Sequence, residues 1–266
     1  MTTKIQLSIL IIEYNSEKWL CDCLDSIMGN IRDEISYEVI VVDNYSGNKL
    51  GKNISDKYPS IEYIANKKNL GFGDGNNVGA AKANGDYLLL INPDTIVIGD
   101  AIQQLYQYIS SHPKYGIIGP RLIQNTNGEE ENDYYGDFPT LKSLLLRNNH
   151  TKIEETKDLF AAERISGACM MMKKEIFDRV GGFDSDYFMY FEDTDLCQKI
   201  SNLGYRIAVL KKSSILHFGG KAHASTKQKK LYYYASQNHY FQKHYGLFQE
   251  TIMKIARWPL KMLKTR

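Results

Sequence analysis

Four short apolar runs in the first part of the chain each stop at polar residues. Residues 7–12, 37–42 and 87–91 are near-continuous runs of the kind that forms strands buried on both faces, and 60–64 is a weaker run. Segments with the apolar spacing of helices separate them. Because strands that alternate with helices form βαβ units, the pattern predicts an α/β fold with a doubly wound, mostly parallel central sheet and flanking helices.

Polar residues stand where these strands end. Glu13-Tyr14-Asn15 follows the first strand, Asp43-Asn44 the second and Asn92-Pro93-Asp94 the fourth. In open parallel sheets, ligands bind beyond the carboxyl ends of the strands. We therefore expect these three strand ends to meet at one crevice.

The second half of the chain is less regular. Residues 124–137 are polar and acidic and predict an exposed loop. A helix is expected over 192–203, with Leu196, Ile200 and Leu203 on one face. Three further expectations are a strand over 165–172, a basic, flexible lid over 219–230 and a tyrosine-rich helix that starts near Leu231.

Composition excludes several classes of protein. Hydrophobic residues make up 43% and charged residues 24%, as in folded globular proteins, and a net charge of +2 gives no argument for a nucleic-acid partner. The four cysteines form no CxxC pair and no zinc spacing, which favours a reduced, cytoplasmic setting. No apolar run has the ~20 residues that a membrane-spanning helix needs.

Several residues near the expected crevice have both a functional and a structural interpretation. Asp43 can accept a hydrogen bond from a base or ribose, or form a local turn. Tyr14 can stack on a nucleobase or simply pack. The glycine-rich segment 69–77 opens a helix, so its N–H groups can meet a diphosphate, although ligand-free glycine turns are common.

The remaining candidates carry carboxylates or an imidazole. Asp94 can bind a hard cation such as Mg²⁺ or Mn²⁺ together with a diphosphate, or belong to a Pro-Asp turn. The run Glu192-Asp193-Thr194-Asp195 can supply a general base or favour a helix start electrostatically. His217 can bind a metal or diphosphate, or be a structural histidine.

Taken in order, these motifs resemble the family 2 glycosyltransferases of the GT-A fold, especially bacterial rhamnosyltransferase-like members. The resemblance covers about Leu7 to His244, nearly the whole chain. It rests on the motifs Ser-Ile-Leu-Ile-Ile-Glu-Tyr-Asn (8–15), Val-Val-Asp-Asn (41–44), Asn-Leu-Gly-Phe (69–72), Asn-Asn-Val-Gly (76–79), Asn-Pro-Asp (92–94), Ile-Ser-Gly-Ala (165–168), Val-Gly-Gly-Phe-Asp (180–184), Phe-Met-Tyr-Phe-Glu-Asp-Thr-Asp-Leu (188–196) and His217.

The resemblance implies a role for each matched position on the donor side. Tyr14 and Asp43 look like the pair that binds the base, and Asn92-Pro93-Asp94 looks like a variant of the DxD motif, with Asp94 on the metal. His217 looks like a second ligand of the metal or diphosphate. We add Asn69 and Gly71 to the nucleotide-sugar site, together with Asn92, and expect Mn²⁺ or Mg²⁺ as the cofactor.

On the acceptor side, Asp193 looks like the catalytic base, with Glu192 and Asp195 as supporting carboxylates. Two positions depart from the family pattern. Glu13 replaces a small residue, and Gln237 replaces an arginine found in many rhamnosyltransferase-like members.

The implied function is inverting transfer of a sugar to a hydroxyl group in the synthesis of bacterial surface polysaccharide. dTDP-rhamnose is the first choice of donor and a UDP-sugar the second, with a glycan or a polyprenyl-diphosphate-linked glycan as acceptor. We expect a catalytic domain over 1–230, with a nucleotide-sugar half (1–115) and an acceptor half (116–230), and a helical segment over 231–266.

Other interpretations remain beside this one. A nucleotidyltransferase would carry a basic, glycine-rich signature near the N-terminus, and an NAD-binding protein would carry G-x-G-x-x-G after the first strand; neither is present. A non-catalytic sugar-nucleotide-binding protein would not need Asp94, Asp193 and His217 together. Residues 247–266 are basic and amphipathic, which suits either peripheral binding to the inner face of the cell membrane or a helix packed on the domain.

Overall fold

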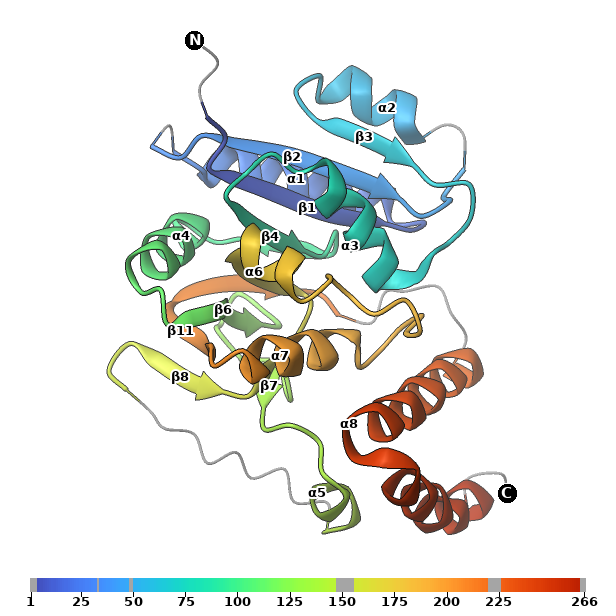
Figure 1. Ribbon diagram of the computed structural model, residues 1–266. Coiled ribbons are helices and arrows are strands. Elements are labelled where there is room, and N and C mark those ends of the chain that lie inside the picture. Colours follow the sequence, from blue (N-terminus) through green and yellow to red (C-terminus); the bar gives the residue numbers. More distant parts are fainter. Residues whose placement is uncertain (1–3, 33, 48–49, 147–155, 220–225, 264–266) are drawn as a thin grey trace.

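The computed structural model describes residues 4–32, 34–47, 50–146, 156–219 and 226–263. Over these residues, one nine-stranded sheet runs through both halves of the chain in the order β3-β2-β1-β4-β10-β6-β11-β5, and β8 pairs with β11. Helices pack against it, and the C-terminal helix α8 lies to one side (Figure 1). The strands of this sheet are β1 (Leu7–Glu13), β2 (Tyr37–Asp43), β3 (Glu62–Ala65), β4 (Tyr87–Ile91), β5 (Thr95–Val97), β6 (Tyr115–Ile123), β8 (Leu159–Ala162), β10 (Cys169–Lys173) and β11 (Arg206–His217).

The helices and a small second sheet complete the fold. The pair β7 (Tyr135–Gly136) and β9 (Arg164–Ile165) forms a two-stranded antiparallel sheet. The helices are α1 (Glu17–Asn30), α2 (Leu50–Lys57), α3 (Gly71–Lys82), α4 (Ala101–Ser111), α5 (Leu141–Leu146), α6 (Lys174–Arg179), α7 (Glu192–Asn202) and α8 (Thr226–Leu263).

The parallel strands expected from the apolar runs are present. The strands β3, β2, β1 and β4 are parallel neighbours, and every residue of β1 and β4 is buried. The register places Glu13 directly beside Asp43 at the carboxyl ends of β1 and β2. The strand β10 then pairs antiparallel with both β4 and β6, and thereby joins the two halves of the sheet.

Helix α3 begins earlier than the glycine-rich segment suggested. It starts at Gly71, so most of that segment is the first half of the helix and not a loop before it. A Cβ atom at Gly73 would stand 3.0 Å from the Phe183 side chain, and one at Gly75 would stand 2.8 Å from Ile12. Glycine costs helix stability, but here it allows the helix to lie very close to the sheet.

Three expectations for the second half are corrected. The segment 124–137 is not simply an exposed loop, because it contains β7 and buries Tyr134, which is only 4% exposed. On α7, Leu196 and Ile200 are fully buried, but the helix ends at Asn202 and Leu203 is 39% exposed. The expected strand over 165–172 is divided between β9 and β10.

Helix α8 is a helical hairpin, visible in Figure 1 as two segments. It starts at Thr226, and Gly246 interrupts it with non-helical angles (φ 84°, ψ 167°). The second segment folds back on the first, since Arg257 donates hydrogen bonds to Gln237 (2.5 Å) and Asn238 (2.6 Å). Of the lid expected over 219–230, residues 220–225 lie outside the described part. Among the described helices, none combines the length and apolar character needed to cross a bilayer.

Candidate active site

The metal end of the candidate site forms where β4 and β11 finish. Thr95 and His217 are opposite each other in the β5–β11 pairing, which brings the His217 ring next to Asp94. Its Nε2 atom lies 3.4 Å from Asp94 Oδ1, and its Nδ1 atom lies 2.8 Å from Glu131 Oε2. Burial alone would lower the pKa of His217, but hydrogen bonds and charge from the two carboxylates outweigh it and raise this pKa to about 9.

These residues fit a divalent cation. Carboxylate oxygens are the ligands that Mg²⁺ and Mn²⁺ prefer, and an imidazole nitrogen is compatible with Mn²⁺. The two carboxylates on either side of His217 favour positive charge at this position, and a bound cation would supply it in place of the histidine proton. Glu131 was missed by the sequence reasoning, which assigned it to an exposed loop; the acidic run around it was the available signal.

The nucleotide end of the site contains Asp43, which is 3% exposed. Its Oδ1 atom accepts the Ser46 N–H at 2.6 Å, and its Oδ2 atom accepts the Tyr63 hydroxyl at 2.7 Å. Burial and the adjacent carboxylate raise the pKa of Tyr63. Sequence reasoning missed Tyr63. We call the neighbouring space the Asp43 cavity, and it is lined by Asp43, Tyr45, Gly47, Gly51, Tyr63, Ala65, Asn66 and Lys67.

Two other residues of this end differ in their surroundings. Tyr14 is 41% exposed beside the end of β1, and its ring is accessible to a ligand. Glu13, the departure from the family pattern, is fully buried and accepts hydrogen bonds from the Ser16 N–H and hydroxyl at the start of α1. Burial raises the pKa of Glu13. Glu13 therefore stabilises the turn between β1 and α1.

The start of α3 is anchored by protein groups. The N–H of Gly71 donates to Asn69 Oδ1 at 2.8 Å, and the carbonyl of Gly71 accepts the Asn44 side chain at 2.7 Å. The next N–H, of Phe72, donates to the Phe188 carbonyl at 3.2 Å. The N–H groups of Gly71 and Phe72 thus have protein partners, so these two groups do not point freely at a diphosphate.

The expected catalytic base lies in the first turn of α7, which we call the catalytic end of the candidate site. Asp193 Oδ2 accepts the Gly167 N–H at 3.0 Å, and Oδ1 accepts the Thr194 N–H at 2.6 Å. Asp193 opens on a cavity of about 250 Å³, which we call the Asp193 cavity. Its lining includes Arg164, Tyr190, Phe191, Glu192, Asp193 and Tyr233, together with part of the segment 133–143.

The two neighbouring carboxylates differ from Asp193. Glu192 also lines the cavity but is 5% exposed, and its Oε2 atom has no hydrogen-bond partner among the described residues. Burial and the charge of Asp193 hold the pKa of Glu192 well above its usual range. Asp195 is fully buried and binds Lys243 (2.8 Å) and His244 (2.7 Å) of α8. Asp195 therefore secures α8 and does not line the cavity.

A short turn connects the metal end to the catalytic end. The Ala168 carbonyl accepts the N–H of Asn92 at 2.9 Å, and the preceding residue, Gly167, donates to Asp193. A Cβ atom at Gly167 would stand 2.9 Å from the ring of Phe72, at the start of α3. The turn 166–168 thus brings the Asn92–Asp94 motif, the α3 start and Asp193 to one centre.

Backbone strain is concentrated at the same cavities. In the described part of the chain, the non-glycine residues with positive φ are Asn15, Tyr45, Asp133, Tyr190 and Phe191. Tyr45 lines the Asp43 cavity, and the last three line the Asp193 cavity. Such conformations cost of the order of 1–3 kcal/mol each and are typical of functional sites.

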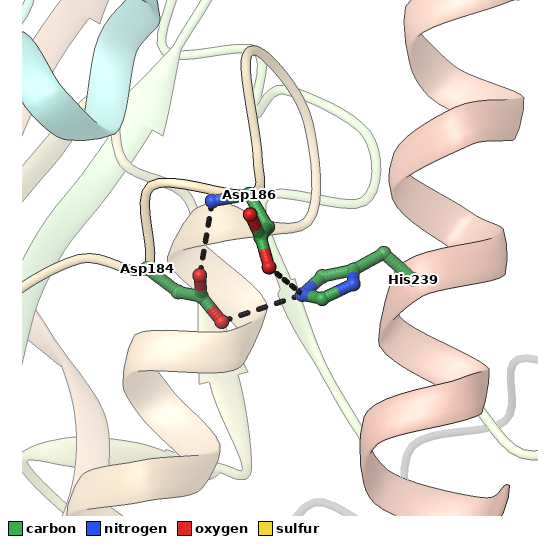
Figure 2. A group of neighbouring side chains, drawn as sticks. All are labelled: Asp184, Asp186 and His239. Atoms are coloured by element: carbon green, nitrogen blue, oxygen red, sulfur yellow. Dashed lines mark hydrogen bonds and ion pairs between the residues drawn. The ribbon is translucent and has the colours of Figure 1, made fainter.

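A second group of potential metal ligands lies apart from these cavities. Asp184, Asp186 and His239 place their ligand atoms within 4.8 Å of one another, and Figure 2 shows His239 of α8 directed at both carboxylates. However, Lys243 Nζ already lies 2.5 Å from Asp184 Oδ2. Because an ammonium group neutralises this carboxylate, we interpret the group as an ion pair that fastens α8 to the loop before α7.

Comparison with known proteins agrees with this architecture. Residues 8–181 match the family model of glycosyl transferase family 2, and residues 147–223 match that of the N-terminal domain of galactosyltransferase. The rhamnosyltransferase WbbL of Escherichia coli K12 is 31% identical over 79% of this chain and 82% of its own. The N-acetylglucosaminyl-diphospho-decaprenol L-rhamnosyltransferase of Mycobacterium tuberculosis is 26% identical over 74% of this chain and 70% of its own.

Solved structures share the fold at low sequence identity. The structure of GalNAc-T7 with UDP, GalNAc and Mn²⁺ has a TM-score of 0.65 and 16% identity. The match covers 90% of this chain and 48% of the GalNAc-T7 chain. The mannosyltransferase PcManGT of Pyrobaculum calidifontis, with GDP-Man and Mn²⁺, has a TM-score of 0.63 and 18% identity over 96% of this chain and 65% of its own. Both are GT-A glycosyltransferases, so the expected fold is confirmed. The family model and the rhamnosyltransferase relatives together show that this chain belongs to glycosyl transferase family 2.

Proposed function

We propose that this family 2 glycosyltransferase is an inverting, metal-dependent enzyme that moves a sugar from a nucleotide diphosphate to an acceptor hydroxyl. The observation that carries the proposal is the turn 166–168. It bonds to Asn92 on one side and to Asp193 on the other, so a diphosphate at Asp94 and an acceptor at Asp193 would lie next to each other. We assign donor binding to the half formed by residues 1–115 and acceptor binding to the half formed by residues 116–230.

A pyrimidine nucleotide is the proposed donor carrier, with dTDP-rhamnose as first choice and a UDP-sugar as second. Relatives that are rhamnosyltransferases support rhamnose as the transferred sugar. Asp43 favours a pyrimidine as the nucleobase, because a buried carboxylate can accept the N3–H of uracil or thymine. The Tyr63 hydroxyl and the Ser46 N–H hold that carboxylate in one orientation.

Asp94 and His217 are the proposed metal ligands, and the position of Glu131 adds a third candidate. When bound, Mn²⁺ or Mg²⁺ supplies positive charge to the departing diphosphate. Both solved structures compared above contain Mn²⁺, which supports a divalent metal in this fold.

Asp193 is the proposed general base. Its two backbone hydrogen bonds fix the carboxylate toward the Asp193 cavity, where it can take the proton of an acceptor hydroxyl. That oxygen then attacks the anomeric carbon as the bond to the diphosphate breaks, and one displacement inverts the configuration. Glu192 is proposed to stay protonated and not to act as the base.

A glycan or a polyprenyl-diphosphate-linked glycan is the proposed acceptor. The lipid-linked alternative is supported by the name of the mycobacterial relative, which contains diphospho-decaprenol. The basic residues of 247–266 support a position at the inner face of the cell membrane.

Calorimetry of nucleotide binding tests the donor and metal assignments together. We expect dTDP and UDP to bind more tightly than GDP in the presence of Mn²⁺. Asp94→Ala should weaken Mn²⁺-dependent binding and also lower turnover, because it removes a ligand to the ion that holds the diphosphate. Tighter binding of GDP than of both pyrimidine nucleotides contradicts the donor, and normal Mn²⁺-dependent binding by Asp94→Ala contradicts the metal role. Inversion is tested by the anomeric configuration of the product, read by NMR.

A further inference from the structure

An apolar groove lies beside the candidate acceptor cavity. We call it the α5–α8 groove, because it forms between the start of α5 and the second segment of α8, with a volume of about 710 Å³. Its lining includes Thr140, Leu141, Lys142, Tyr245, Phe248 and Ile252.

The segment 138–143 contributes to both the groove and the Asp193 cavity. Phe138, Pro139 and Ser143 line the Asp193 cavity, whereas the residues between them, 140–142, line the groove. The Tyr245 hydroxyl donates to the Pro139 carbonyl at 3.0 Å, which fixes α8 against this segment. The cavity and the groove are therefore lined by neighbouring residues of one short segment, within reach of a single long ligand.

Apolar side chains are unusually exposed along this part of α8. Phe248 is 78% exposed and Ile255 is 66% exposed; with Ile252 they follow the i, i+4, i+7 spacing of one helix face. Leu247 is 64% exposed beside them. Contiguous exposed apolar surface of this kind marks a binding site for an apolar partner.

Polarity differs between the cavity and the groove. Carboxylates and Arg164 line the Asp193 cavity, whereas the exposed Lys142 and mostly apolar side chains line the groove. A sugar suits the polar cavity, an anionic phosphate suits Lys142, and a hydrocarbon chain suits the apolar side chains of the groove. A free glycan carries no hydrocarbon chain to cover the exposed aliphatic surface of the groove.

We infer that the acceptor is an amphipathic lipid-linked sugar whose hydrocarbon chain binds in the α5–α8 groove, with its phosphate at Lys142 and its reacting hydroxyl at Asp193. The inference rests on the proposed function for the role of Asp193. It adds a chain-binding site on α8 and decides between the two acceptor classes.

The test measures binding of two diphosphates that differ in chain length. Decaprenyl diphosphate and dimethylallyl diphosphate are presented in detergent micelles, which remove any bilayer. We expect the wild-type protein to bind the long chain at least about tenfold more tightly, and Phe248→Asp to lose that preference, because a charge replaces apolar contact. Ile98→Asp is the matched control, since Ile98 is also an exposed apolar residue (43%) but does not line the groove.

Two further measurements show where the hydrocarbon chain binds and whether the variants fold. A decaprenyl diphosphate with a photoreactive chain end should label peptides from 140–142 or 245–252. Equal melting temperatures of the three proteins show that the substitutions act locally. Equal wild-type affinity for both diphosphates, or label outside these peptides, overturns the inference.

Other occupants give different results. If Phe248→Asp keeps the chain-length preference and only lowers pelleting with anionic vesicles, or changes the oligomeric state, the groove is a bilayer or self-association surface and the inference is wrong. Nucleotide-sugar binding by the wild-type protein is measured in parallel. If nucleotide sugars do not bind, the proposed function is wrong. The preference for the long chain is measured without a nucleotide sugar and tests the inference separately.

Discussion

Replacing Asp193 with Asn removes the proposed proton acceptor and also disturbs two hydrogen bonds. In the wild-type protein, one carboxylate oxygen accepts the Gly167 N–H and the other accepts the Thr194 N–H. Asparagine has only one side-chain oxygen, so its amino group must face one of these N–H groups. An unsatisfied, partly buried donor costs about 1–3 kcal/mol, and each kcal/mol lowers the melting temperature by about 2–4 °C in a chain of this size.

The expected kinetic effect is larger than the effect on stability. General-base catalysis contributes about 10²–10⁴ in rate, so Asp193→Asn should lower transfer turnover by at least about a hundredfold, or about 2.7 kcal/mol of activation free energy. Donor affinity should stay near that of the wild type, because neither N–H group belongs to the Asp43 cavity. Steady-state transfer, donor titration and thermal unfolding measure the three quantities on the same preparation.

Glu192→Gln is the matched control for this experiment. Burial and the charge of Asp193 raise the pKa of Glu192 and so favour its neutral form, whose shape and charge glutamine preserves. We expect this variant to keep near wild-type turnover. The assignment is refuted if Asp193→Asn remains active while Glu192→Gln is inactive.

Three further substitutions test other parts of the site. Tyr63→Phe removes the 2.7 Å hydrogen bond to Asp43, so calorimetry should show several-fold weaker donor binding, with turnover at saturating donor unchanged. Gly71→Ala should lower the free energy of unfolding in urea by more than about 2 kcal/mol, since its Cβ would stand 2.2 Å from the Phe188 carbonyl oxygen at a φ of +84°. Burial alone would raise the pKa of Asp184, but ion pairs and hydrogen bonds lower it from 3.8 to about 2. A lowered folded-state pKa stabilises the protein above the unfolded-state value, so the advantage of wild type over Asp184→Asn in urea should be full above about pH 4 and disappear as the pH falls towards 2; an advantage that grows on acidification would contradict this reasoning.

The sequence determined the strands and the crevice at their ends. A strand buried on both faces must be apolar along its whole length, and such a run is visible in the local sequence, which is why β1, β2 and β4 lie where the pattern indicated. The motif order also sufficed to recognise the family. The local pattern was less informative at the start of α3, because glycine has a low helix propensity and these glycines are explained only by close packing against Ile12 and Phe183.

Tertiary structure alone decided which side chains meet. The contact between Tyr63 and Asp43 depends on the β2–β3 register, and that between Glu131 and His217 joins residues 86 positions apart. In the run Glu192–Asp195, each residue turns the side chain by about 100° around the helix, so Asp193 and Asp195 face nearly opposite directions. The sequence offered three carboxylates of the same local chemistry, and the packing of α7 against α8 and against the turn 166–168 gave each its own partners.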